Sequence, residues 1–89
     1  MAGCKLITYD LRKAGQNYEG VIEKIKSFGT WAKVCESTWI VKTALSSVQV
    51  RDALKPQIDA NDRLFVATLT GESAWFNTIC DSNWLTQNL

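Results

Sequence analysis

The apolar residues of this chain follow two spacings, and each change of spacing marks a new element. Residues 4–10 are apolar in the middle and end on a carboxylate, which predicts a first strand with Asp10 at the rim of a sheet. A stripe at helical spacing follows and predicts an amphipathic helix that ends near Gly29. The stripe consists of Tyr18, Val21, Ile22, Ile25 and Phe28.

Two short runs rich in Trp, Val and Ile come next, at residues 31–35 and 38–43. The break between them is two residues long, Glu36-Ser37, and this arrangement predicts a β-hairpin.

The second half of the chain repeats the helix-then-strand pattern. Ser46 and Gln49 stand at the spacing of a capping box, which predicts the start of a second helix. Pro56 should end the regular part of that helix. A polar turn at 59–62 then leads into a fourth strand, residues 63–69.

The predicted order is therefore β-α-β-β-α-β. Right-handed crossovers favour a four-stranded antiparallel sheet in the order 4-1-3-2 with both helices on one face, which is the ferredoxin-like α+β fold. The 89 residues should form a single domain, with a core at 4–70 and an apolar tail at 71–89 that docks on a folded surface.

The strands are more apolar than a sheet with one wet face requires. Residues 64–67 and 39–41 are continuously apolar, so both faces of the sheet should be covered. Two helices cover one face, and a second copy of the chain is the simplest cover for the other. We therefore expect a homodimer with Trp39, Trp75 and Phe76 at its interface; the alternative is that the tail closes its own sheet or reaches the partner by edge addition.

The predicted topology gathers polar residues from three parts of the sequence along one rim. The end of the first strand lies beside the beginnings of the third and fourth strands, because these run antiparallel to it. The residues gathered there are Asp10, Arg12, Glu36, Ser37, Asp62 and Arg63, and Tyr9 and Lys13 adjoin them in the sequence.

This rim allows two interpretations. Mg²⁺ takes one or two carboxylates together with water and phosphate oxygens, so Asp10 is the candidate metal ligand and catalytic residue, supported by Tyr9, Glu36, Ser37 and Asp62. Arg12, Lys13 and Arg63 would then hold a phosphate. The structural alternative is that Asp10 caps a turn, the arginines neutralise it, and Glu36-Ser37 simply turns the hairpin.

Composition excludes several classes of function. The net charge of +1 is far from the basic footprint of an avid nucleic-acid binder, so phosphate contacts must be local. The sequence contains no His, which removes the usual general base of a Ser or Cys triad. Three widely spaced cysteines and the lack of a signal peptide or a bilayer-length apolar run predict a cytoplasmic protein with reduced thiols and no membrane contact.

The strand that ends in Tyr9-Asp10-Leu11, together with the hairpin of residues 36–41, resembles the small CRISPR-associated adaptation nuclease family. Small bacterial and phage proteins labelled "SinR family" are still more similar; that label suggests a repressor, but no helix-turn-helix is visible in this sequence. The resemblance covers residues 4–76. Its motifs are Tyr9-Asp10-Leu11, Glu36-Ser37-Thr38-Trp39, Asn61-Asp62 and Leu69-Thr70-Gly71-Glu72.

The resemblance implies a ferredoxin-like homodimer with opposed sheet faces, in which Asp10 of each subunit is the metal ligand and the segment after Leu69 crosses to the partner. Family members often carry a basic run after the Asp, which is reduced here to Arg12-Lys13. A toxin-like ribonuclease family, the virulence-associated D proteins, shares this fold, so the fold does not choose the function.

Two hypotheses of different classes follow. The first is a homodimer that binds nucleic acid or a nucleotide, with Mg²⁺-dependent phosphodiester cleavage through Asp10 as its enzymatic form. The second is a non-enzymatic dimer that sequesters a small nucleotide or docks a partner protein, as a phage counter-defence protein would. A purely structural assembly subunit is a third possibility.

Overall fold

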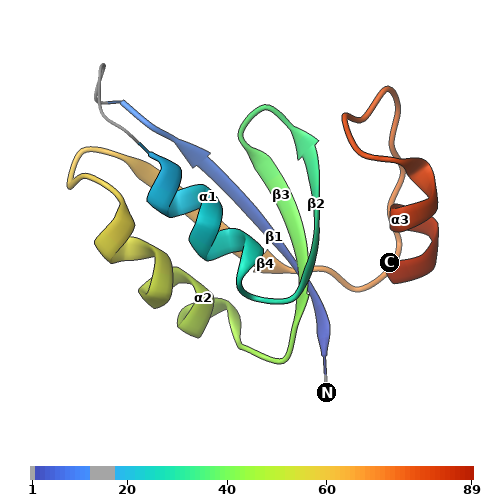
Figure 1. Ribbon diagram of the computed structural model, residues 1–89. Helices are drawn as coiled ribbons and strands as arrows, with labels where there is room; N and C mark the ends of the chain where they lie inside the picture. The colour runs from blue at the N-terminus through green and yellow to red at the C-terminus, as the bar shows by residue number, and fades with distance from the viewer. Residues whose placement is uncertain (1, 13–17) are drawn as a thin grey trace.

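The computed structural model describes residues 2–12 and 18–89. Four strands and three α-helices follow one another in this part of the chain (Figure 1). A short 3₁₀ turn, Lys55–Gln57, extends the second helix. The elements are β1 (Gly3–Asp10), α1 (Glu19–Lys26), β2 (Thr30–Cys35), β3 (Thr38–Thr43), α2 (Ser47–Leu54), β4 (Arg63–Thr68) and α3 (Ser82–Asn88).

The strands form one open antiparallel sheet in the order β2-β3-β1-β4, which confirms the predicted strand order. β1 lies inside the sheet, with β3 on one side and β4 on the other. Ile7 is paired with Trp39 of β3 and with Val66 of β4, so the apolar centre of β1 is also the centre of the sheet.

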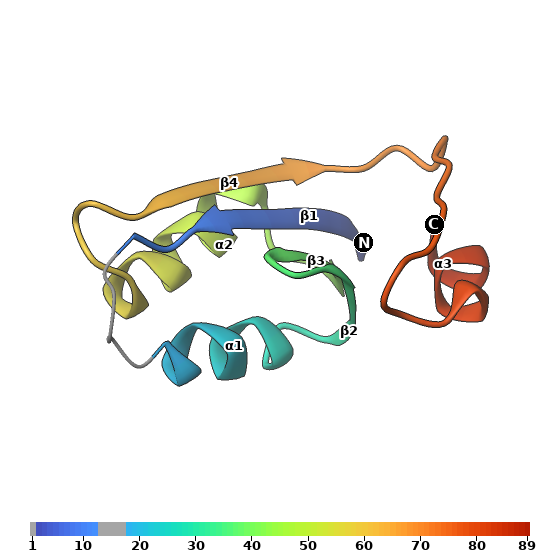
Figure 2. The ribbon, with the colours of Figure 1, turned by 90° about the horizontal axis from the view of Figure 1, so that it is seen from above.

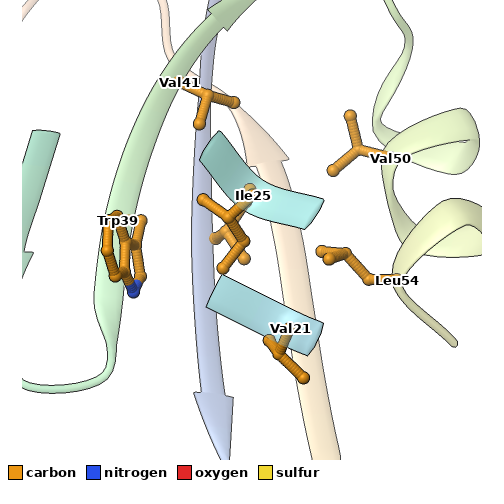
Figure 3. Close-up of a cluster of buried hydrophobic side chains, with 7 residues drawn as sticks. Val21, Ile25, Trp39, Val41, Val50 and Leu54 are labelled. Atoms are coloured by element: carbon orange, nitrogen blue, oxygen red, sulfur yellow. The ribbon is translucent and has the colours of Figure 1, made fainter. Parts of the chain in front are cut away.

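The main core lies between the sheet and the helices α1 and α2. Ile25 of α1 lies between Trp39 of β3 and Leu54 of α2 (Figure 3). Because side chains alternate along a strand, the odd-numbered residues of β1 and β3 and the even-numbered residues of β4 face these helices. The buried members are Ile7, Val21, Ile25, Trp39, Val41, Val50 and Leu54.

Local sequence signals place the helix ends. Ser46 and Gln49 form the predicted capping box: the Gln49 N–H donates to Ser46 Oγ at 3.1 Å, and the Ser46 N–H donates to Gln49 Oε1 at 2.9 Å. α2 ends at Leu54, as Pro56 in the following turn predicts. Gly29 has a φ of +155°, and a Cβ there would press against the Lys42 carbonyl, so the position requires glycine.

The tail closes part of the second face of its own sheet. Leu85 of α3 is 1% exposed and packs with Cys4 of β1 and Ile40 of β3. Asp81 caps α3 by accepting the Asn83 N–H at 2.8 Å. Figure 2 shows β2 and β3 between α3 and α1. Of the alternatives for the tail, the described chain therefore shows closure of its own sheet, while residues 74–76 are irregular.

The other end of the second face is left open. Phe65 of β4 is 60% exposed, and it is paired with Thr8 of β1, whose Oγ1 lies 3.2 Å from Thr38 Oγ1. Trp39, by contrast, is 3% exposed and belongs to the core beneath α1. Its odd position in β3 turns it to the helix side, where it packs within the chain; of the other residues expected at an interface, Trp75 and Phe76 are exposed.

Among the described residues, no helix has the length and apolar character needed to span a bilayer.

Candidate functional site

Asp10 forms an exposed cluster with two arginines. It is paired across the strands with Arg63, whose Nη1 donates to Asp10 Oδ2 at 2.9 Å. Arg12 Nη1 lies 3.6 Å from the same oxygen. The side chains of all three residues are about half exposed or more, so these ion pairs contribute at most about 1 kcal/mol to stability. Asp10 is thus neutralised by arginines yet open to solvent.

Asp10 and Arg63 of this cluster line a shallow pocket of about 200 Å³. Asp10 and Thr8 are even-numbered residues of β1, and Arg63 and Phe65 are odd-numbered residues of β4, so all four belong to the second face of the sheet at its open end. The pocket is lined by Thr8, Tyr9, Asp10, Arg63, Leu64 and Phe65.

Asp62, predicted as rim support, holds the frame of the rim together. Its Oδ1 accepts the Arg12 N–H at 2.7 Å and the Tyr18 hydroxyl at 3.1 Å, and its Oδ2 accepts the Asp59 N–H at 2.7 Å. A carboxylate with both oxygens engaged in this way connects the end of β1, the start of α1 and the turn before β4. Its role is therefore structural.

Tyr9 and Ser37 also position the rim. The Tyr9 hydroxyl accepts the indole N–H of Trp39 at 3.0 Å, and the Tyr9 N–H donates to the Ser37 carbonyl at 3.1 Å. The hairpin turn is thereby held against β1, with Glu36 exposed beside Ser37. Lys13, predicted as a phosphate contact, lies outside the described residues.

The fit of a metal ion rests on Asp10. Across residues 2–12 and 18–89, no group of three or more Asp, Glu, Cys or His side chains is placed to hold a metal. Mg²⁺ needs one or two protein carboxylates when water and phosphate complete its shell. Because Asp62 is engaged in structural hydrogen bonds, Asp10 is the carboxylate in the rim pocket that suits this role.

Three pocket residues did not figure in the predicted rim: Thr8, Leu64 and Phe65. The signal for Phe65 was present, because it lies two positions after Arg63 and so shares its face. Because large apolar side chains occupy both faces of β4, the sequence pattern did not indicate which face Phe65 takes.

A larger hollow of about 660 Å³ lies between the end of α2 and β4. Arg51 and Lys55 border it together with Asp59 and Asp62, so cations and carboxylates are mixed there. Arg51 pairs with its neighbour Asp52 at 2.9 Å.

Comparison of the chain with family models, with curated proteins and with solved structures gives no match.

Proposed function

We propose that this chain is a ferredoxin-like protein that binds a nucleic acid or nucleotide through the Asp10 rim. One observation carries the proposal: the guanidinium groups of Arg12 and Arg63 converge on one exposed carboxylate, beside the exposed ring of Phe65. Guanidinium groups bind phosphate bidentately, and aromatic rings stack on bases. The β-α-β-β-α-β order and the strand order support the ferredoxin-like assignment.

A homodimer is part of this proposal. The open end of the second face exposes Phe65 next to the Asp10 cluster, so a second copy seated there would bury that ring and bring two rims together. The resemblance to the CRISPR-associated adaptation nucleases favours the same arrangement. Closure of the other end by α3 limits the contact to the rim half of the face.

Phosphodiester cleavage is the enzymatic form of the proposal. Mg²⁺ held by the Asp10 carboxylates of two copies would supply Lewis-acid chemistry at a phosphate. In each chain Arg63 would orient the phosphate, while Tyr9 and Asp62 would keep the rim in place through their hydrogen bonds. The free thiols of Cys4, Cys35 and Cys80 are consistent with the reducing cytoplasm as the proposed location.

Binding is tested by fluorescence anisotropy with a labelled single-stranded RNA, a labelled duplex DNA and a panel of nucleotides. We expect Arg63→Ala to weaken binding at least tenfold. Arg51→Ala is the matched control, because Arg51 is an exposed arginine outside the rim pocket. Equal affinity of both variants and the wild type would refute the rim as the binding site.

Cleavage and assembly are tested separately. Incubation of wild type and Asp10→Ala with RNA and DNA, in Mg²⁺ or in EDTA, should give metal-dependent products for the wild type alone. Equal background in both proteins would reject catalysis. Sedimentation should show a dimer that Phe65→Asp dissociates, and a 10.0 kDa species at every concentration would reject the dimer.

The second candidate function is a non-enzymatic dimer that captures a small nucleotide or docks a partner protein. The 2.9 Å ion pair between Asp10 and Arg63 favours it, because a metal ion would have to compete with a guanidinium already in place. Calorimetry with nucleotides distinguishes this candidate: binding that survives in EDTA and produces no cleavage would support it.

A further inference from the structure

Another pocket lies at the opposite edge of the sheet, between β2 and the tail. Its volume is about 290 Å³. Its wall is formed on one side by the β2 strand and on the other by the segment that leads into α3. The lining residues are Trp31, Ala32, Lys33, Ile79, Cys80, Asp81 and Trp84.

The tail closes this pocket at both ends. The Ile79 N–H donates to the Val34 carbonyl at 3.0 Å, and the Trp84 indole N–H donates to Thr30 Oγ1 at 3.0 Å. Thr30 and Val34 are four residues apart on a strand, which corresponds to about 13 Å. An extended peptide cannot run along the edge through these two contacts, so the pocket suits a short, compact ligand.

The strand presents backbone hydrogen-bonding groups to this pocket. The Tyr9 N–H donates to the carbonyl of Ser37, which is an odd-numbered residue just before β3. Because hydrogen-bonded pairs alternate along an antiparallel ladder, the odd-numbered residues of β3 direct their N–H and C=O groups toward β1, and the even-numbered residues direct theirs toward β2. Ala32 is the partner of Ile40, so Ala32 turns its groups toward β3. Trp31 and Lys33 therefore direct their N–H and C=O groups to the open edge.

One indole ring, that of Trp84, lies on the tail side of the sheet beside this pocket. Trp31 is paired with Val41, so its side chain takes the opposite, helix-covered face: its ring lies 5.4 Å from the ring of Trp39 and carries the Lys26 ammonium at 4.7 Å. Trp84 is held by its bond to Thr30. Rings that are ordered before binding lose little entropy when a ligand stacks on them.

We infer that this pocket binds a nucleobase. A planar heterocycle fits its size, can stack on the Trp84 indole, and pairs its donor-acceptor edge with the backbone of Trp31 and Lys33 as a neighbouring strand would. The ligand needs no phosphate, so this site is independent of the rim and of the function proposed for it.

The test uses adenosine, guanosine and cytidine, which lack phosphate, with ribose as the ligand without a base. In ¹H–¹⁵N spectra of the wild type we expect the nucleosides to shift the backbone amides of Trp31 and Lys33, and ribose to leave them unchanged. Because the wild type is used, this measurement does not depend on a variant that folds. Unshifted amides at millimolar nucleoside would overturn the inference.

Calorimetry with variants gives the second arm. Trp84→Ala should raise the Kd for the best nucleoside at least tenfold. Phe76→Ala is the matched control, since Phe76 is an aromatic residue of the same tail, 87% exposed and outside the pocket. Arg63→Ala should bind nucleosides like the wild type. If Arg63→Ala lost nucleoside binding while Trp84→Ala kept it, the base would bind at the rim and the inference would be overturned. This outcome is separate from the test of phosphate binding at the rim.

Discussion

The backbone N–H of Arg12 donates to Oδ1 of Asp62 at 2.7 Å, which connects residues fifty positions apart at the edge of the candidate site. Arg12 follows β1, and Asp62 precedes β4. The carboxylate of Asp62, which the sequence predicted as rim support, thus fixes the backbone from which Asp10 and Arg63 project.

Asp62→Asn should destabilise the protein by about 1–3 kcal/mol, because the amide nitrogen replaces one acceptor oxygen and faces a backbone N–H or the Tyr18 hydroxyl. Urea unfolding measures the effect. Asp52→Asn is the control, since Asp52 is exposed and pairs with adjacent Arg51; it should change stability by less than about 0.5 kcal/mol. Equal stability of the two variants would contradict the structural role of Asp62.

Tyr9→Phe should lower stability by about 1–3 kcal/mol, since it removes the acceptor of the indole N–H of Trp39, a residue that is 3% exposed. Affinity for a rim ligand should stay within twofold of the wild type, because the Tyr9 hydroxyl points to the core side of the sheet. Thermal unfolding and anisotropy give the two readouts. Unchanged stability with lost binding would instead make Tyr9 a ligand contact.

Leu85→Ala should release the tail from the sheet. Removing a fully buried leucine costs about 2–5 kcal/mol. We expect iodoacetamide to label Cys4 much faster in this variant, as followed by mass spectrometry, because Cys4 lies under α3 and its Sγ–H donates to the Asn88 carbonyl.

The control for the tail is Gln87→Ala, a substitution on the exposed side of the same helix. In the wild type and in this control, exposed Cys35 should react first and buried Cys4 last. Rapid labelling of Cys4 in the wild type would show that the tail does not cover this face.

Stability should fall in alkaline solution partly because of Cys4. Burial raises the pKa of its thiol above the ordinary 9.0, although Lys42 and Lys5 oppose the shift. Because the pKa of the thiol is lower in the unfolded chain, the unfolded chain loses this proton first as the pH rises. The stabilisation that Cys4 provides is therefore complete below pH 9.0 and is lost as the pH rises toward the pKa of the folded state. Unfolding measured from pH 8 to 10.5 should show a shallower decline for Cys4→Ala than for Cys35→Ser. Parallel declines would contradict this prediction.

The strand order was predictable because the turns and helix caps are local signals. The capping box at Ser46, the two-residue break at Glu36-Ser37 and the central apolar strand each depend on a few neighbouring residues. Together with right-handed crossovers they leave one simple arrangement of the four strands.

The roles of the rim residues were less predictable, because they depend on which face each side chain takes. Trp39 and Ile40 are both large and apolar, and a shift of one position decides whether a residue faces α1 or the tail. Likewise, proximity of Asp10 and Asp62 followed from topology, but the engagement of Asp62 by three donors depends on loop geometry that no spacing rule gives.

Asp62 holds the main chain of Arg12 and the hydroxyl of Tyr18 with the same oxygen, so one acid anchors both flanks of the connection between β1 and α1. Loss of this single carboxylate would therefore release the end of β1 and the approach to α1 at the same time.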